Sequence, residues 1–422
     1  METNFEQAVQ ERAVLVGLNA DCFRQDQTAT DETLEELEAL LETAGGFCTG
    51  KILQNRHTPD PHSFIGEGKA QEVRMLVEFT GSTMVVFDNE LSPSNIRALE
   101  EIIGVTVLDR SALILDIFAQ RAKTKEGRLQ VELAQYQYLL PRLSGMGASL
   151  SRQGGGIGTR GPGETKLESD RRHIRERINR LQSELEQVRQ VRSVQRERRM
   201  KNSVPVVAIV GYTNAGKSTL LTQLTGAGIP ANNRLFDTLD TTSRQLTVSD
   251  TLDVVLSDTV GFIAKLPHHL VNAFRATLEE LEYADLLLHV IDAADENREE
   301  HIEVVEKLIE KLAKPGTPVL RCYNKADLVS REDIPVGEDV VAMSAAKGTG
   351  MDQLLAAIEK ALDQKRHHVK VTLPYSMGGM VETLHNNAQV ISVDYSADGI
   401  EIETILDEIL YGRLKDYVKK EC

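Results

Sequence analysis

Tryptophan is absent from this chain of 422 residues, and aromatic residues make up only 5% of it. Surfaces on which nucleic-acid bases stack are rich in aromatic side chains, so we do not expect such a surface here. The four cysteines, Cys22, Cys48, Cys322 and Cys422, are far apart and show no C-x-x-C spacing. This pattern argues against a disulfide framework or a zinc site, and it indicates reduced thiols in the cytosol.

Long apolar runs are missing as well. No stretch approaches the roughly 18 consecutive apolar residues of a membrane-spanning helix, and residues 1–6 show no basic start followed by an apolar run. We therefore expect neither a membrane span nor a secretory signal, and we expect a cytoplasmic location. The chain is long enough for about two to four domains, each with a core of its own.

Charge is unevenly distributed along the chain. The net charge is −16, and an even spread of it would argue against a nucleic-acid partner. Residues 119–201, however, hold 19 Lys and Arg against 9 Asp and Glu, a local charge of +10 that leaves −26 on the rest of the chain. Such asymmetry indicates one basic element that docks on a polyanion.

A phosphate-binding loop of the form G-x-x-x-x-G-K-[ST] occupies positions 211–218. It follows an apolar run at 206–210 and opens into a helix-like segment at 219–224, which is the strand, loop and helix context that the motif requires. Backbone N–H groups of such a loop close around a β-phosphate, and the helix dipole strengthens the attraction. The loop residues are Gly211, Tyr212, Thr213, Asn214, Ala215, Gly216, Lys217 and Ser218.

Within this loop we expect Lys217 to bridge the β- and γ-phosphates and the hydroxyl of Ser218 to bind Mg²⁺. The alternative, a glycine turn between any strand and any helix, is disfavoured by the complete match. A D-x-x-G segment ends a later apolar strand. There Asp258 would act on Mg²⁺ through water, and the N–H of Gly261 would sense the γ-phosphate. Its four residues are Asp258, Thr259, Val260 and Gly261.

Two further strand ends predict which base is bound. Asp327 closes an N-K-x-D segment, and its carboxylate can accept hydrogen bonds from the N1–H and exocyclic amine of guanine, which adenine lacks. Pockets of this kind reject the wrong partner by roughly 10⁴-fold. These segments consist of Asn324, Lys325, Ala326 and Asp327, and of Ser344, Ala345 and Ala346, whose backbone would touch the base edge. The order of the motifs predicts a GTPase.

Residues 1–118 alternate strand-like and helix-like patterns, which predicts a small parallel α/β domain. The predicted helices are 31–44, with Asp31 as its N-cap, and one that begins at Ser92-Pro93. Segment 65–69 has two interpretations, a structural turn, which we favour, or a ligand-binding loop. The predicted strands cover 13–18, 47–54, 83–87 and 105–108.

A helical hairpin is predicted next. Helices are expected at 111–121 and 129–143, followed by a glycine-rich segment at 153–163 and a long helix at 164–199. Apolar residues recur along the long helix with the spacing of a heptad seam. We therefore expect it to pair with the 129–143 helix as an antiparallel hairpin that has the glycine-rich segment at its tip. The seam residues are Leu167, Ile174, Ile178, Leu181, Leu185 and Val188.

Taken together, these patterns predict an α/β protein. We expect an α/β domain with a long antiparallel helical hairpin at 1–203, a P-loop GTPase domain at 204–365, and a small α+β module at 366–422. The expected elements of the module are strands at 369–373, 388–395 and 399–405 and a helix at 379–386. Nothing in its sequence indicates a chemistry.

Arginines that lie off the seam give the long helix a basic surface. One interpretation is the solvated face of an ordinary coiled coil. The other, which we favour, is a contact with nucleic acid, because Arg152, Arg160 and Lys166 also flank the glycine-rich tip. The off-seam arginines are Arg171, Arg172, Arg175, Arg189, Arg192, Arg196, Arg198 and Arg199.

The segment from Gly154 to Glu168 resembles the glycine-rich tip of the HflX family of ribosome-associated GTPases, within the Obg–HflX group, and the likeness extends along nearly the whole chain. The resemblance implies a monomer that binds GTP, GDP and the large ribosomal subunit, reaches toward the peptidyl-transferase centre, and splits stalled or idle ribosomes. Two alternatives stay open. One is a GTPase checkpoint in large-subunit assembly, and the other is an RNA-remodelling ATPase, against which the absence of helicase motifs argues.

The resemblance also places the first switch loop. The family pattern aligns its magnesium-binding threonine with Thr238, although Thr241 and Thr242 remain alternatives, because Asp237 replaces a small residue and Thr241 replaces a proline. Besides Thr238, the loop residues expected at the nucleotide are Phe236, Asp237, Leu239 and Asp240.

Catalysis by the chain alone is expected to be slow. Many GTPases place a glutamine after D-x-x-G to orient water, whereas this chain has Phe262 there, and no arginine finger can be assigned. We therefore expect Lys217, Thr238 and Gly261 to be the main catalytic groups. Asn214 resembles an asparagine that holds K⁺ near the phosphates in related GTPases. Its alternative role is that of a polar residue in a turn.

Overall fold

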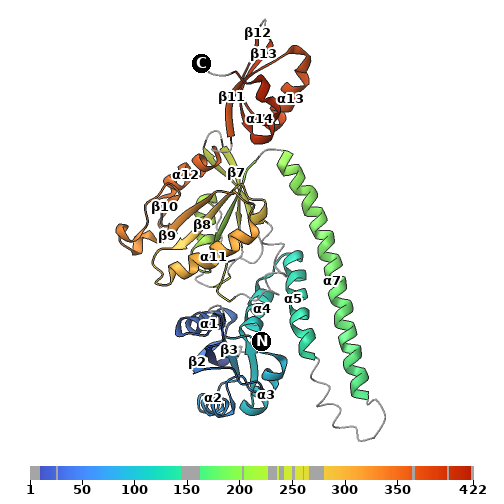
Figure 1. Cartoon of the computed structure of the whole chain (residues 1–422), viewed down its shortest axis with the longest axis vertical. Coiled ribbons are helices and arrows are strands. Elements are labelled where there is room, and N and C mark those ends of the chain that lie inside the picture. The colour runs from blue at the N-terminus through green and yellow to red at the C-terminus, as the bar shows by residue number, and fades with distance from the viewer. Residues whose placement is uncertain are drawn as a thin grey trace, which may run out of the picture. The chain divides into compact units, whose positions relative to one another are not determined.

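The computed structural model of the chain (Figure 1) divides into two compact units. Unit 1 comprises Met1–Glu186, Asn232–Asp240 and Ile263–Ala276, and unit 2 comprises Gln187–Ala231, Thr241–Phe262 and Thr277–Cys422. The structure describes residues 10–24, 27–143, 162–201, 204–226, 235–236, 242–249, 252–259, 261–265, 280–363, 366–396 and 399–419. Over these ranges, no helix is long and apolar enough to cross a membrane.

Unit 1 is built on a four-stranded parallel sheet with the order β2-β1-β3-β4. The two inner strands are made of small and branched apolar residues that are almost completely buried. Because the strand order reverses beside β1, the carboxyl ends of β1 and β3 flank the place where open α/β sheets bind ligands. The strands are β1 (Arg12–Ala20), β2 (Phe47–Arg56), β3 (Met84–Phe87) and β4 (Thr106–Asp109).

Four helices connect or follow these strands. They are α1 (Asp31–Ala44), α2 (Glu67–Thr80), α3 (Pro93–Ile103) and α4 (Arg110–Arg121).

Two features of these helices differ from the sequence expectation. The N-cap of α1 is Thr30 and not Asp31, because the side chains of Thr30 and Thr33 each accept the other's backbone N–H in a reciprocal capping box. Helix α2 was not predicted. Its N-cap is Gly66 at φ +84°, so segment 65–69 is the start of a helix.

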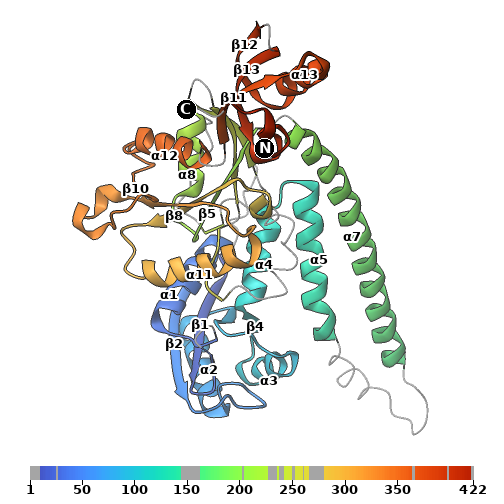
Figure 2. The ribbon, with the colours of Figure 1, turned by 45° about the horizontal axis from the view of Figure 1, so that its top comes forward.

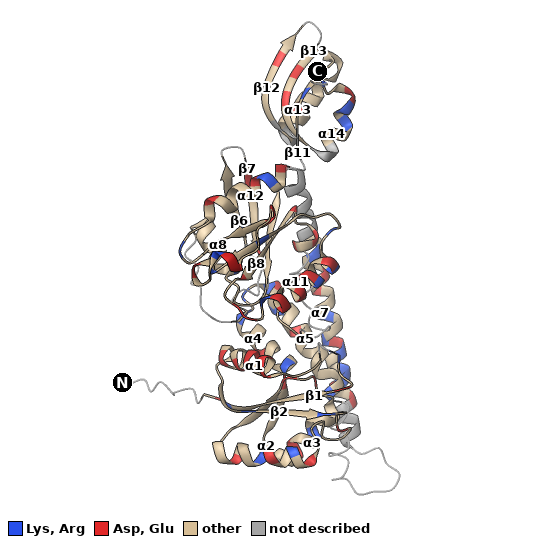
Figure 3. Cartoon of the chain, turned by 60° about the vertical axis from the view of Figure 1, so that its left-hand side comes forward, with Lys and Arg blue, Asp and Glu red and all other residues tan. Residues whose placement is uncertain are grey.

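The helical hairpin is confirmed by α5 (Lys125–Arg142) and α7 (Pro162–Lys201), which run side by side (Figures 1 and 2). Arg177 of α7 forms an ion pair of 2.7 Å with Glu132 of α5. The seam residues Leu181 and Leu185 are buried, while Gln182, Ser183 and Glu186 beside them are exposed. Figure 3 shows Lys and Arg at intervals along the coloured part of α7, with acidic residues between them.

Unit 2 contains a six-stranded sheet with the order β10-β9-β8-β5-β7-β6, in which only the β6–β7 pair is antiparallel. Its strands are β5 (Val206–Gly211), β6 (Thr242–Ser249), β7 (Leu252–Asp258), β8 (Leu286–Asp292), β9 (Val319–Asn324) and β10 (Val340–Ala342). The helices are α8 (Lys217–Thr225), α11 (Arg298–Leu312) and α12 (Met351–Asp363), with short 3-10 turns at Ala326–Leu328 and Arg331–Asp333.

A small antiparallel sheet with the order β11-β13-β12 completes the chain and has its own apolar core, which includes Val371 and Ile402. Its elements are β11 (Arg366–Leu373), α13 (Gly378–Asn387), β12 (Gln389–Ser396), β13 (Gly399–Asp407) and α14 (Glu408–Leu414), with 3-10 turns at Tyr375–Met377 and Lys415–Tyr417. Helix α14 was not predicted. The predicted fold class is confirmed, whereas the predicted bounds of the three domains stay predictions.

Candidate nucleotide site

The loop after β5 needs glycine at both of its fixed glycine positions. Gly211 has φ +156°, and a Cβ built on it would lie 2.2 Å from the carbonyl oxygen of Val290. Gly216 has φ +95°, and a Cβ there would lie 2.1 Å from Nδ2 of Asn324. Since both neighbours are held in place by the sheet, a side chain at either position would push the loop out of register.

Lys217 lies at the start of α8 with its side chain drawn back across the loop. Its Nζ donates hydrogen bonds to the carbonyl oxygens of Gly211 at 3.0 Å and Tyr212 at 2.6 Å. Burial lowers the pKa of this ammonium to about 8, although the nearby carboxylate of Asp258 opposes the shift. The loop therefore holds a buried cation that an additional negative charge would stabilise.

Ser218 and Asp258 come together at the edge where β5 and β7 end. The hydroxyl of Ser218 donates to Oδ2 of Asp258 at 3.1 Å, and Asp258 is 1% exposed. Hydroxyl and carboxylate oxygens are the hard ligands that Mg²⁺ prefers, and Mg²⁺ typically takes only one or two protein ligands beside phosphates and water. The hydroxyl and carboxylate donors of this pair fit Mg²⁺.

Backbone hydrogen bonds join the D-x-x-G segment to the phosphate-binding loop. The N–H of Phe262 donates to the carbonyl of Gly211 at 3.1 Å, and the N–H of Thr213 donates to the carbonyl of Phe262 at 2.7 Å. A Cβ on Gly261 would lie 3.1 Å from Nζ of Lys217, so this glycine lies directly beside the ammonium. The hydroxyl of Thr259 donates to the carbonyl of Ile209 at 2.7 Å and fixes the end of β7.

The N-K-x-D segment follows β9 and lies against the same loop. Asn324 donates through Nδ2 to the carbonyl of Ala215 at 2.8 Å, and its Oδ1 accepts from the N–H of Ala345 at 2.9 Å. Lys325, in the left-handed region at φ +59°, donates through Nζ to Oδ2 of Asp292 at 2.6 Å. The N–H of Ala326 donates to the carbonyl of Met343 at 3.0 Å.

Asp327 lies at the outer side of this cluster. Hydrogen bonds from Ser344 and from Lys347 lower the pKa of its carboxyl, and Lys347 is 3.0 Å away. The carboxylate is therefore ionised near neutral pH and can accept hydrogen bonds from a base. Ser344 is buried, and Ala346 follows it on the exposed side of the turn after β10.

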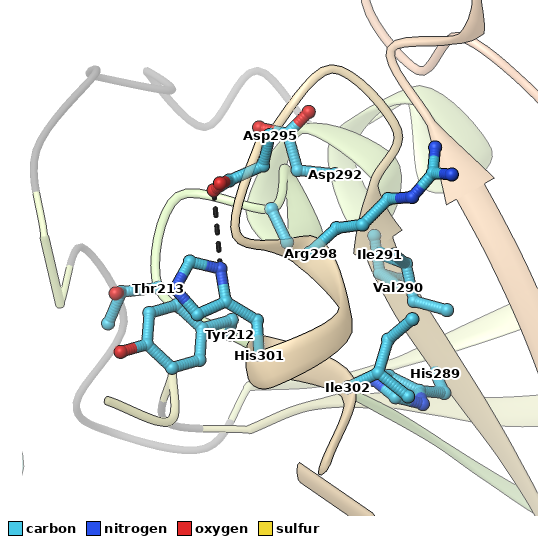
Figure 4. A pocket seen from close by; sticks show the side chains of 11 residues that line it. Tyr212, Thr213, His289, Val290, Ile291, Asp292, Asp295, Arg298, His301 and Ile302 are labelled. Atoms are coloured by element: carbon cyan, nitrogen blue, oxygen red, sulfur yellow. Dashed lines mark ion pairs between the residues drawn. The ribbon is translucent and has the colours of Figure 1, made fainter. Parts of the chain in front are cut away.

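Four residues near the loop were not identified from the sequence, namely His289, Asp295, Arg298 and His301. The ring of Tyr212 stacks on the imidazole of His301 with the centroids 3.6 Å apart, and Nδ1 of His301 is 3.2 Å from a carboxylate oxygen of Asp295 (Figure 4). These side chains line a small pocket beside the loop together with His289 and Arg298. No sequence motif marks them, because the stacking depends on how α11 packs beside β5. Asn214, at φ +60°, adopts a turn conformation that asparagine tolerates.

For several predicted site residues the structure describes no contact within this cluster. Phe236 is buried in unit 1, where its ring lies 4.8 Å from that of Phe118 in an edge-to-face arrangement. The remaining ones lie outside the described residues, and so does most of the glycine-rich tip. They are Asp237, Thr238, Leu239, Asp240 and Val260.

Three family models match the chain. They are described as the GTP-binding GTPase N-terminal region, over residues 31–119, the GTP-binding GTPase middle region, over 121–199, and the 50S ribosome-binding GTPase, over 206–325. Together they cover most of the elements described above up to the N-K-x-D segment.

Curated relatives match over most of the chain. The GTPase HflX of Caldanaerobacter subterraneus is 47% identical over 97% of this chain and 94% of its own length. The GTPase HflX of Escherichia coli strain K12 is 46% identical over 87% of each chain. A crystal structure of a GTP-binding protein from Sulfolobus solfataricus in complex with GDP, 25% identical, covers 84% of this chain and 99% of that one with a TM-score of 0.45.

Proposed function

Because this chain belongs to the HflX family of GTPases, we propose that it binds the large ribosomal subunit and dissociates stalled or idle ribosomes. GTP binding drives dissociation, and hydrolysis, stimulated by the ribosome, resets the protein. The observation that supports this proposal most is the assembly of four sequence-distant segments, one of which is the phosphate-binding loop, in a chain that also carries a long basic hairpin. A nucleotide site and a polyanion-binding element are the two parts that such a factor needs.

In this proposal each segment of the cluster has a role toward GTP. Lys217 turns from the loop carbonyls to the β- and γ-phosphates, whose charge restores the full ionisation of its ammonium. Asn324 keeps the loop and the turn after β10 in register. Asp327 accepts the two guanine donors, and the chain thereby selects GTP over ATP.

Ser218 and Asp258 are the described groups that would hold Mg²⁺, with Thr238 as the predicted third ligand. When bound, the ion neutralises charge that develops on the phosphate oxygens during phosphoryl transfer. Gly261 lies beside the ammonium of Lys217, which is the position from which its N–H can respond to a γ-phosphate.

Slow hydrolysis by the isolated chain follows from Phe262. Its side chain is 2% exposed and its backbone is bonded to the phosphate-binding loop, so this position offers no polar group that orients water. If the large subunit supplies the groups that this site lacks, GTP is hydrolysed rapidly only when the chain is bound to the ribosome.

The hairpin is the proposed ribosome-binding element. Two of the off-seam arginines, Arg172 and Arg175, are exposed. Contacts from such residues to phosphates form the sequence-independent part of nucleic-acid binding. Residues 144–168 at the tip would reach the ribosomal RNA, with the arginines of α7 adding contacts along its length.

A sedimentation experiment tests the proposal. Intact ribosomes are incubated with the full chain and a non-hydrolysable GTP analogue and then separated on a sucrose gradient. We expect conversion to subunits, and we expect none with Lys217→Ala, which loses the phosphate contact. Co-sedimentation with the large subunit without splitting would favour the assembly checkpoint. Equal support by ATP and GTP analogues would favour the RNA-remodelling ATPase.

A further inference from the structure

The carboxyl ends of β3 and β4 in unit 1 carry a buried ion pair. Asp88 follows β3, is 2% exposed, and accepts a hydrogen bond of 2.8 Å from Nη1 of Arg110, which is 1% exposed and begins α4. Arg110 also pairs with Glu36 of α1. The hydroxyl of Thr33, likewise on α1, donates to the second oxygen of Asp88 at 2.8 Å. This cluster lies at the ligand-binding end of the parallel sheet.

A segment from a distant part of the sequence contacts this cluster. Lys265 forms an ion pair with Asp88 through Nζ, and its side chain is 9% exposed. Arg110 donates through Nη2 to the carbonyl oxygen of Ala264 at 3.2 Å. Ala264 and Lys265 follow the last residue of the D-x-x-G motif by three and four positions. Residues 263–276 are grouped with the N-terminal residues in one compact unit.

The second such segment, residues 235–236, lies at the start of the predicted first switch loop. The backbone N–H of Leu235 donates to the hydroxyl of Thr43 on α1 at 3.3 Å. Phe236 is 2% exposed and packs edge-to-face on Phe118 of α4. Both segments therefore contact α4, and segment 235–236 also contacts α1, which packs against α4.

The Lys265 contact is more than a surface ion pair. Burial lowers the pKa of Lys265, and the charge of Asp88 opposes that shift. The ammonium group of Lys265 therefore loses hydration at this site, and its attraction to Asp88 offsets the cost. Buried ion pairs of this kind contribute little net free energy of folding. They favour one position of the two segments relative to each other, because either charge left without its partner is strongly unfavourable. Lys265 also adopts φ +55°, a backbone conformation that non-glycine residues seldom keep without tertiary contacts.

We propose that Thr33, Glu36, Thr43, Asp88, Arg110 and Phe118 form a receptor surface for the two chain segments 235–236 and 263–265, and that this surface transmits the nucleotide state to the N-terminal domain. The inference rests on the proposed role of Gly261 as the γ-phosphate sensor. Phe262 and Ile263 are the only residues between Gly261 and Ala264. A displacement of Gly261 must therefore either move the carbonyl group of Ala264, which Arg110 binds, or be resisted by that hydrogen bond. By linkage, the receptor surface must then influence nucleotide preference as well.

Hydrogen exchange of the full chain with GDP and with a non-hydrolysable GTP analogue tests this inference. We expect the exchange rates of amides in α1 and α4 to differ between the two nucleotides in the unchanged protein. In Lys265→Met, which keeps the length of the side chain and removes its charge, the difference should shrink severalfold. The GTP-to-GDP affinity ratio should change severalfold in the same variant.

Lys51→Met is the matched control. Lys51 pairs with Glu38 of α1 at 2.6 Å in the same unit but touches neither segment, so its nucleotide response should equal that of the unchanged protein. The inference is wrong if α1 and α4 do not respond to nucleotide in the unchanged protein, a measurement that needs no variant. An equal response in Lys265→Met and the unchanged protein would also overturn it. The hydrogen-exchange experiment contains no ribosomes. Its result can therefore be interpreted even if the chain turns out not to split ribosomes.

Discussion

The side-chain amide of Asn324 joins parts of the candidate site that are more than a hundred residues apart in the sequence. Its two hydrogen bonds, to the carbonyl of Ala215 and from the N–H of Ala345, are both buried. Loss of the amide would leave these backbone groups without their partner, and an unsatisfied buried group costs about 1–3 kcal/mol. Asn324 therefore acts on the base pocket by holding two loops together, while Asp327 is positioned to contact the base itself.

At Asp327 the substitution Asp327→Asn should invert the preference for the base. An amide can donate to the carbonyl oxygen that xanthine has where guanine has its exocyclic amine, so xanthosine triphosphate should bind and GTP should lose about 100-fold or more in affinity. Titration with fluorescent nucleotides measures both affinities. Lys360→Asn, at an exposed lysine of α12 in unit 2, is the control. Unchanged GTP affinity in Asp327→Asn would show that another group reads the base.

Lys217 gives a prediction about pH. Its pKa in the folded chain is lowered from 10.5 to about 8, so between these values the folded chain has lost a proton that the unfolded chain keeps, and stability should rise with pH in this window. Phosphates favour the protonated lysine, so nucleotide affinity should be full below about pH 8 and fall above it. Calorimetric titration of GDP from about pH 7 to 9 measures the change. A flat affinity profile would contradict the assigned contact.

Among the elements, the strand ends could be predicted well because the motifs and the apolar runs before them reinforce each other. The hairpin was predictable from its seam, in which Leu181 and Leu185 are buried as the heptad spacing requires. Helix α2 was missed because its sequence after Gly66 has a weak apolar pattern, with only Ala70, Val73 and Val77 buried. The stacking of Tyr212 on His301 and the contacts of Lys265 depend on tertiary packing, which no local pattern reports.

The hairpin tip carries the prediction at this scale. Deletion of residues 153–163 should leave GTP affinity unchanged, since none of the described nucleotide-site contacts involves them, and should abolish ribosome splitting. Sedimentation and nucleotide titration of the same preparation measure both properties.

Binding of the unchanged protein to the large subunit should also weaken steeply with salt, in proportion to the number of phosphates that its arginines neutralise. Charge reversal of Asp253, an exposed residue of β7 in unit 2, provides a comparison that leaves the hairpin intact. If the variant that lacks residues 153–163 splits ribosomes normally, the tip serves only as a linker.

At the scale of the whole molecule, the chain has a net charge of −16 and one basic hairpin. Its nucleotide-binding motifs and its predicted RNA contact therefore lie in different parts of the sequence. Phosphoryl transfer requires a positioned water and positive charge around the γ-phosphate. The described site supplies Lys217 and the oxygens of Ser218 and Asp258, while Phe262 supplies no polar group. Turnover by the isolated chain should therefore be slow and should rise by orders of magnitude when large subunits are added.

Turnover should be measured at saturating GTP with and without large subunits, each in K⁺ and in Na⁺ buffer, by release of inorganic phosphate. A higher rate in K⁺ would support a K⁺ ion at Asn214, and Asn214→Ala should then remove the difference between the buffers while leaving GTP affinity nearly unchanged. A lack of any K⁺ effect would remove only this role. Fast hydrolysis by the isolated chain in Na⁺ would overturn the mechanism, because the site would then be complete without the ribosome.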